Sequence, residues 1–304
     1  MMKIFENPQE YIPLAKKAIK KFGYAPEHNL EWFFCATEPY QQPIFISWPD
    51  GSGLLTQKEK NAWSIFVNPV VPKEKLLDRV LEFIEYAFNQ AGINKIWLEL
   101  TEDESTKLKD IIKDRKLNYS PKRPAIDTWP VMNIEMFNPD LPGRHFKEIR
   151  NARNKFYREY KVEIKNAVEC EVVDLKKMVD EWRKTRIAGD RAYYHRYYFL
   201  IESGFKCCKT ARAMIINGKI VGLNGGWDIP NANKYFYAAI GLHNYSLKDL
   251  GLILYLEDLI WIKNAGYIKA NMGGGFADLT NFKNQFLPES WYKTYLFSVI
   301  KSSG

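Results

Sequence analysis

A run of basic residues between Arg144 and Lys161 is the clearest candidate surface for an anion. Seven Lys and Arg residues stand there against two Glu, a net charge of +5 within a chain whose formal charge is +8. At about 100° per residue, one helical face would carry basic and amide side chains. These are Lys147, Arg150, Asn154, Arg158 and Lys161. The pattern predicts an amphipathic helix whose polar face either tracks phosphates, of tRNA or of an anionic membrane surface, or is simply solvated.

Three further groups of residues could handle a substrate. Within the Tyr- and Arg-rich stretch 185–204, Arg191 and Arg196 could hold a phosphate, or the stretch is a helix packed on a sheet. Asp228 ends a predicted strand after Gly225-Gly226-Trp227, where it either receives a substrate ammonium or is an ordinary turn acid. The predicted substrate pocket is lined by Tyr237, Asn271, Gly273, Gly274 and Gly275.

Several classes of protein are excluded by what the sequence lacks. The four cysteines form no C-x-x-C pair and the four histidines are scattered, so we expect neither a disulfide framework nor a metal site. No apolar run approaches the roughly 20 residues that span a bilayer. The N-terminal segment has no signal core, which predicts a cytoplasmic protein, able to work peripherally at a membrane. No Ser-His-Asp, P-loop or Rossmann pattern is present.

The elements that must position these residues occur twice along the chain. Predicted strands at 43–48 and 62–70, a helix at 73–90 and a strand at 96–100 form the first copy. The second copy has strands at 211–218, 219–229 and 234–242, a helix at 247–264 and a strand at 267–272, followed by a helix at 279–286. Ala91-Gly92 and Ala265-Gly266 align at an offset of 174 residues. We therefore predict a structural duplication, against the alternative of two unrelated stretches with similar helix ends.

The order strand–strand–strand–helix–strand–helix resembles the GNAT acyltransferase fold in tandem. The string LPGRHFKEIRNARNKFYREYKVEI (141–164) is similar to the phosphatidylglycerol lysyltransferase catalytic domain. The string MGGGFADLTNFKNQF (272–286) resembles the glycine turn and Phe-Lys of FemAB-like aminoacyltransferases. The resemblance implies an α/β (α+β) fold of two GNAT-like domains, each with a mixed, mostly antiparallel sheet flanked by helices. We predict a non-catalytic domain over 1–120, a proline-rich linker over 121–142 with a crossing strand at 131–136, and a catalytic domain over 143–304.

The resemblance also assigns a role to Phe282 and Lys283. It implies that Lys283 supplies positive charge near the reacting carbonyl while Phe282 packs inward; the alternative is a surface lysine on an amphipathic helix. GNAT enzymes hold the pyrophosphate of coenzyme A on a glycine-rich loop that opens a helix. The matching segment here, 246–251, keeps only Gly251, and Asp249 would repel a pyrophosphate or act as a first-turn acid.

These observations predict an acyltransferase without a tightly bound cofactor. The preferred co-substrate is aminoacyl-tRNA, and the acceptor is an amine or hydroxyl of a lipid head group, a peptide or a small molecule. Acyl-CoA is the second choice of donor. A binding module that has lost its chemistry is the third possibility, against which the Phe-Lys and the three glycines argue.

Overall fold

The computed structural model describes residues 2–113, 115, 117–186 and 193–301. The strands are β1 (Lys3–Phe5), β2 (Gln42–Ser47), β3 (Gly53–Lys58), β4 (Ala62–Ile65), β5 (Lys95–Thr101), β6 (Leu117–Asn133), β7 (Val162–Asn166), β8 (Thr210–Ile216), β9 (Lys219–Asp228), β10 (Tyr235–His243), β11 (Lys269–Asn271) and β12 (Ser290–Lys301). The helices are α1 (Pro8–Phe22), α2 (Leu30–Ala36), α3 (Leu76–Asn89), α4 (Glu102–Lys113), α5 (Lys147–Glu159), α6 (Val172–Thr185), α7 (His195–Glu202), α8 (Leu250–Asn264) and α9 (Ala277–Asn284), with short 3-10 turns η1 (Lys73–Lys75) and η2 (Ala167–Glu169).

The predicted duplication is present in the structure. Helices α3 and α8 begin at Leu76 and Leu250, and strands β5 and β11 begin at Lys95 and Lys269, so both pairs are 174 residues apart. In each copy the strand after the helix pairs in parallel with the strand before it: Ala62 lies opposite Lys95, and Tyr235 lies opposite Lys269. All other strand pairs described are antiparallel. The mixed, mostly antiparallel α/β fold is therefore confirmed.

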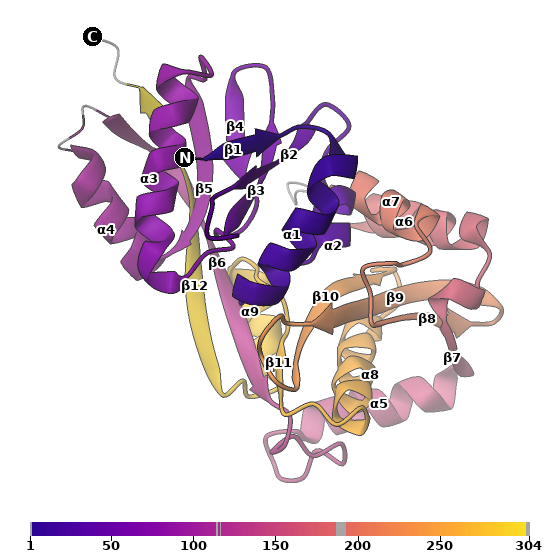
Figure 1. The fold of residues 1–304 in the computed structure, drawn as a ribbon. Coiled ribbons are helices and arrows are strands. Elements are labelled where there is room, and N and C mark those ends of the chain that lie inside the picture. The colour runs from indigo at the N-terminus through magenta and orange to yellow at the C-terminus, as the bar shows by residue number, and fades with distance from the viewer. Residues whose placement is uncertain (1, 114, 116, 187–192, 302–304) are drawn as a thin grey trace.

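The two copies share one sheet. Among the described residues, twelve strands follow the order β1-β2-β3-β4-β5-β12-β6-β11-β10-β9-β8-β7. Strand β12, from the second copy, pairs with β5 of the first along Lys95–Thr101, and with the long strand β6 on its other side. Figure 1 shows β6 and β12 lying side by side as the longest pair, joining the two halves. The linker over 121–142 stays a prediction as a domain boundary. Strand β6, which overlaps this segment, is part of the shared sheet.

The crossing strand is longer than expected and begins earlier. We predicted a strand over 131–136 inside a proline-rich linker, whereas β6 covers Leu117–Asn133. Proline cannot donate to a strand ladder, which is why the sequence favoured a linker. Pro130 fits because its carbonyl accepts a hydrogen bond from the Met272 amide at 3.1 Å, using the one polar backbone group that proline keeps.

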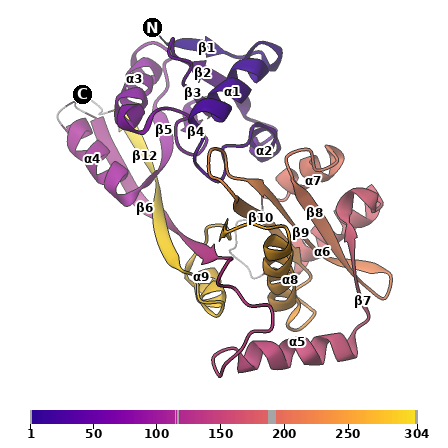
Figure 2. The ribbon, with the colours of Figure 1, turned by 60° about the horizontal axis from the view of Figure 1, so that its bottom comes forward.

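Helices cover both faces of the sheet in the second half (Figures 1 and 2). Helix α8 packs Leu250, Ile253 and Leu254 on one face, together with Phe156 of α5. Helices α6 and α7 cover the opposite face, where Leu175, Val179 and Leu200 contact Ala213 and Leu223. Helix α2 of the first half joins that layer, since Trp32 lies 5.4 Å from Trp227 between ring centroids. The first half therefore covers part of the second. Among the described residues, no helix combines the length and apolar character needed to cross a membrane.

Candidate active site

The centre of the second half is a place where two neighbouring strands part. Strand β10 pairs with β11 only from Tyr235–Lys269 to Tyr237–Asn271. Immediately beyond, its pairing with β9 shifts register between Tyr237 and Ile240, as in a β-bulge. Bulges turn a strand away from its neighbour and leave backbone groups unpaired. The pairing of β10 and β11 therefore ends after three residue pairs, and we call the place where the two strands part the opening of the sheet.

A glycine turn leads the chain out of β11 beside this opening. Gly273 has φ +81°, which only glycine adopts without strain, and a Cβ there would lie 3.6 Å from the Ala238 carbonyl oxygen. A Cβ on Gly274 would lie 2.6 Å from the indole of Trp129, so the turn can pack on that ring only as glycine. The Gly275 amide and carbonyl pair with Thr128 at 3.2 and 3.0 Å. The three glycines thus hold the turn against β6.

Lys283 is buried under this turn. Its side chain is directed back from α9, and its ammonium donates to the carbonyls of Met272 and Gly273, both at 2.7 Å. Only 5% of the residue is exposed. Burial lowers the pKa of Lys283 to about 7, against the opposing effect of the Asp127 carboxylate. An ammonium has three donors, so one N–H is left for a further acceptor in the opening.

A carboxylate from the first half reaches the same region. Glu27 accepts hydrogen bonds from the Trp32 indole and the Tyr237 phenol, both at 3.3 Å. Burial raises the pKa of Glu27, while the charge of Arg196 opposes the shift. The neighbouring His28 holds the loop: its Nδ1 accepts from the amides of residues 24 and 25, and its Nε2 bonds the Asn68 carbonyl at 2.8 Å. Burial lowers the pKa of His28 to about 4, so it stays neutral in this role.

Two more carboxylates come from β5 and β6. Glu99 accepts from the Thr294 hydroxyl at 2.6 Å, and Thr294 accepts from the Trp129 indole at 2.8 Å. Burial raises the pKa of Glu99 to about 7, and the charges of Glu27 and Asp127 add to this shift. Asp127 also raises the pKa of Glu27. The charge of Asp127 thus raises the pKa of both Glu27 and Glu99, and the charge of Glu27 raises the pKa of Glu99, so we call these three residues the acid cluster.

Known proteins share both the sequence pattern and the fold of this chain. A family model described as phosphatidylglycerol lysyltransferase, C-terminal, matches residues 24–235, more than half of the chain. The chain belongs to this family. No curated protein sequence matches it significantly.

Solved structures similar to this lysyltransferase-family chain share its fold at low identity. A conserved protein of unknown function from Bacteroides thetaiotaomicron has a TM-score of 0.68 at 17% identity, over 99% of this chain and 100% of that one. L-PGS from Bacillus licheniformis has a TM-score of 0.68 at 14% identity, over 98% and 93%. FemX has a TM-score of 0.62 at 12% identity, over 99% and 98%. The predicted resemblance to lysyltransferase, FemAB-like and tandem GNAT proteins is confirmed for the family and the fold.

The predicted pocket residues of this family member do come together. Tyr237 bonds Glu27, and its ring meets that of Trp227 edge-on at 5.2 Å. Asn271 donates to the Tyr292 hydroxyl at 2.8 Å and accepts from the Gly273 amide at 2.9 Å. Phe282 packs against Tyr255 at 5.5 Å between centroids, so it points inward while Lys283 turns to the glycine turn. The alternative of a surface lysine at 283 is wrong, because the side chain is buried.

Asp228 lies apart from this group. It is exposed and accepts a hydrogen bond from the Tyr267 phenol. The adjacent Trp227 belongs to the buried layer with Tyr237, and successive side chains on a strand point to opposite faces. Asp228 therefore faces away from the acid cluster, and its binding of a substrate ammonium stays a prediction.

The basic residues of α5 are divided between two tasks. Lys147, Asn154 and Arg158 of α5 are exposed, as is Lys161 just beyond the end of the helix, and an anion-binding face requires this exposure. Arg150 instead donates to the carbonyls of Leu141 and Gly143, and Arg153 donates to that of Pro139 at 2.8 Å. These two arginines hold the preceding loop. Arg196 lies over the rings of Trp32 and Tyr193, at 5.7 and 4.9 Å. Arg191 lies outside the described residues.

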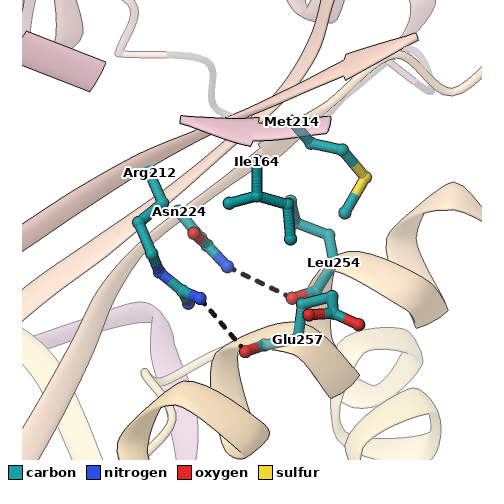
Figure 3. Close-up of a pocket in the computed structure, with 6 residues that line it drawn as sticks. All are labelled: Ile164, Arg212, Met214, Asn224, Leu254 and Glu257. Atoms are coloured by element: carbon teal, nitrogen blue, oxygen red, sulfur yellow. Dashed lines mark hydrogen bonds between the residues drawn. The ribbon is translucent and has the colours of Figure 1, made fainter. Parts of the chain in front are cut away.

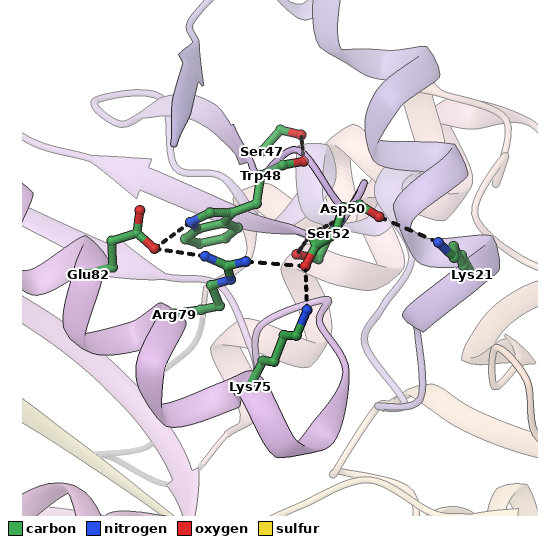
Figure 4. A network of polar contacts seen from close by, with 8 residues as sticks. All are labelled: Lys21, Ser47, Trp48, Asp50, Ser52, Lys75, Arg79 and Glu82. Atoms are coloured by element: carbon green, nitrogen blue, oxygen red, sulfur yellow. Dashed lines mark hydrogen bonds and ion pairs between the residues drawn. The ribbon is translucent and has the colours of Figure 1, made fainter. Parts of the chain in front are cut away.

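The matching helix start in the first half is occupied by an internal ion pair. Asp50, from the turn between β2 and β3, accepts from Lys75 at 3.1 Å and from Arg79 at 3.2 Å (Figure 4). Arg79 also pairs with Glu82 at 2.9 Å and lies over the Trp48 ring. The side chains that could bind an anion at the start of α3 are thus engaged by carboxylates of the protein itself. That the first half is non-catalytic stays a prediction.

The sequence did not point to Glu27, Glu99, Asp127 or Trp129 as site residues. Glu27 lies in a loop 210 residues before its partner Tyr237, so no local spacing joins them. One signal was available: Glu99 is an acid inside the apolar strand 96–100, and a carboxylate on a half-buried strand needs a partner or a function.

Proposed function

We propose that this protein transfers a cationic aminoacyl group from aminoacyl-tRNA to an amine or hydroxyl acceptor. The observation that carries the proposal is the acid cluster beside the parting of β10 and β11, with Lys283 at its edge. The lysyl group in the family's name is a cation of this kind. No tightly bound cofactor is needed for the transfer.

The acid cluster favours a positively charged substrate. Glu27 and Glu99 both have raised pKa values, with burial as the main cause. A cation bound among such carboxylates compensates for the hydration that the carboxylates lose on burial, and it favours their ionised form. The surrounding rings of Trp32, Trp129, Trp227 and Tyr237 can also stabilise an ammonium over their faces. We infer that the amino groups of the transferred residue bind here.

Transfer itself needs few groups from the protein. The acceptor oxygen or nitrogen attacks the ester carbonyl, the bond to the terminal ribose of the tRNA breaks, and the ribose hydroxyl receives the proton that the acceptor loses. Negative charge develops on the carbonyl oxygen during the attack. The third N–H of Lys283 is the donor proposed to stabilise it.

The exposed residues of α5 provide the expected contact with tRNA. Replacing Arg158 and Lys161 together by Glu should weaken tRNA binding strongly and reduce the slope of log K against log salt, by about 1 for each phosphate that the variant no longer neutralises. Filter binding at several salt concentrations measures both. Replacing Lys17 and Lys20 of α1 by Glu is the matched control, since both are exposed and lie in the first half. Arg150 is unsuitable as a test residue because it holds the loop at Leu141 and Gly143. Equal binding by wild type and the α5 variant would remove α5 from the interface.

A transfer assay tests the function directly. Purified protein is given lysyl-tRNA or alanyl-tRNA carrying a radioactive amino acid, with phosphatidylglycerol vesicles, a peptide amine or a small amine as acceptor. The proposal expects transfer from lysyl-tRNA to exceed that from alanyl-tRNA with at least one acceptor. Absence of transfer to every acceptor, with tRNA bound, would favour a module that binds without chemistry.

Acyl-CoA remains the alternative donor, since tandem GNAT proteins share the fold. The helix start where its pyrophosphate would bind is unfavourable here: Asp249 precedes α8 with φ +62° and its side chain caps no amide. A Cβ on Gly251 would lie 2.7 Å from the His243 ring, so that ring covers the start of the helix. We therefore expect calorimetry to show weak or no binding of acetyl-CoA. A dissociation constant in the low micromolar range would make acyl-CoA the preferred donor.

A further inference from the structure

A second hollow lies at the β7 edge of the sheet. Its volume is about 560 Å³, within the usual range of ligand pockets. It is bounded by the end of β7, by the 204–212 segment that leads into β8, and by Trp261 of α8. Its lining, all within the described residues, includes no acid and four cations: Lys165, Lys206, Lys209 and Arg212.

Two of these four cations are already balanced by carboxylates outside the lining. Lys165 pairs with Glu163 at 3.2 Å, and Arg212 pairs with Asp258 at 2.7 Å. Lys206 and Lys209 are exposed, and neither forms an ion pair with the part of the chain that the structure describes. The hollow therefore carries two unbalanced positive charges. A phosphomonoester at neutral pH carries about −1.5 to −2 charges, which matches them, whereas a phosphodiester carries one.

Hydrogen bonds join the back wall of the hollow to α8. Arg212 donates to the Glu257 carbonyl at 3.2 Å, and Figure 3 shows it directed from β8 to α8, beside Asn224 bonded to Leu254. The side chains drawn in Figure 3 leave a gap between the sheet and α8, and this gap has no room for a water molecule. The Arg212 guanidinium lies 5.3 Å from the ring centroid of Trp261, and its buried Nε has no partner among the described residues.

We propose that this hollow binds a phosphomonoester whose organic part lies against Trp261. Lys206 and Lys209 hold the phosphate, and the ring of Trp261 with the side chain of Ile164 forms the apolar side. The site is separate from the acid cluster, because none of Glu27, Glu99 and Asp127 lines the hollow. It does not depend on the proposed aminoacyl transfer.

Three related compounds test the charge argument by calorimetry on the full chain. AMP is a phosphomonoester, cyclic AMP is a phosphodiester with the same base, and adenosine has no phosphate. We expect AMP to bind more tightly than cyclic AMP, and adenosine to bind least. Equal binding of AMP and adenosine would overturn the proposal.

Paired variants locate the binding. Lys206→Ala with Lys209→Ala should weaken AMP binding by about tenfold or more, since the charged hydrogen bonds of both lysines are removed. Lys17→Ala with Lys20→Ala removes the same charge from α1 and should leave binding unchanged. Glu27→Gln should also leave it unchanged, which separates this site from the acid cluster. Wild-type affinity in the Lys206/Lys209 variant, or equal weakening in both lysine pairs, would refute the site.

The same variants distinguish a soluble ligand from a lipid. Sedimentation with phosphatidylcholine vesicles that contain phosphatidic acid, a lipid phosphomonoester, is compared with vesicles that contain phosphatidylglycerol, a phosphodiester. Retention on phosphatidic acid that needs Lys206 and Lys209 assigns the hollow to a lipid head group. AMP binding without such retention assigns it to a soluble phosphomonoester.

Discussion

Replacing Lys283 by methionine is expected to lower turnover by about 10²–10³, because the reaction loses a donor aimed at the developing oxyanion. Methionine fills similar space and cannot donate a hydrogen bond. The carbonyls of Met272 and Gly273 then lose their partner, at a cost of about 1–3 kcal/mol for each buried group left unpaired. Thermal unfolding and transfer from aminoacyl-tRNA are therefore measured on the same preparation, with the assay kept well below the unfolding midpoint.

The pH profile separates a role in the reaction from a role in the fold. Burial lowers the pKa of Lys283 to about 7, so the ammonium is present below that pH and is lost as the pH rises through it. Wild-type turnover should accordingly fall above about pH 7. In the Lys283→Arg variant, the remaining activity should show no such decrease, because a guanidinium stays charged over the whole pH range of the assay. Lys293→Ala, an exposed lysine on β12, is the control and should be neutral. Unchanged turnover in Lys283→Met would remove the residue from the mechanism.

Glu27→Gln is expected to reduce transfer of a lysyl group by about 10–10²-fold, the effect of losing one charged hydrogen bond of about 1.5–3 kcal/mol. Glutamine has the same shape, and its oxygen can still accept from Trp32 and Tyr237. Loss of charge is therefore the main change. The measurement is kcat/KM for lysyl-tRNA and for alanyl-tRNA. The ratio of the lysyl-tRNA value to the alanyl-tRNA value should decrease.

The matched control is Glu31→Gln. Glu31 lies one turn further along, in α2, and pairs with Lys16 at 3.3 Å on the surface. It should leave both substrates unchanged. Equal reductions for lysyl-tRNA and alanyl-tRNA in Glu27→Gln would show that Glu27 maintains the loop instead of binding the substrate cation.

The sequence predicted the elements of the second half well because their signals are local. Between the predicted strands 211–218 and 219–229, Asn217 and Gly218 have φ +51° and +75°, as a tight hairpin turn requires, and α8 ends at Asn264 as expected. The apolar face of α5 was also predicted, and Ile149 and Phe156 are buried. Such features depend on periodicity and turn chemistry within a few residues of one another.

The parts that were missed depend on contacts between the halves. Nothing near residue 27 reveals that its carboxylate meets a tyrosine 210 positions later. Prolines in 121–142 favoured a linker, yet β12 supplies a partner strand that keeps residues 117–131 extended. The burial of Lys283 could not be read from its helix, because the acceptors are backbone carbonyls, which carry no sequence signal. Tertiary structure overrode the local pattern at each of these places.

The position of β12 has a consequence for how the chain is made. The strand that completes the sheet of the first half, between β5 and β6, consists of residues 290–301. During synthesis, β5 therefore emerges from the ribosome nearly 200 residues before β12. Until β12 is made, the backbone groups along one edge of β5 have no partner strand. Pairing over such a separation is slow, and an open edge invites association with other chains. The two halves have the same order of elements, but they complete their shared sheet together. We therefore expect the nascent chain to be prone to association with other chains until β12 has been synthesised.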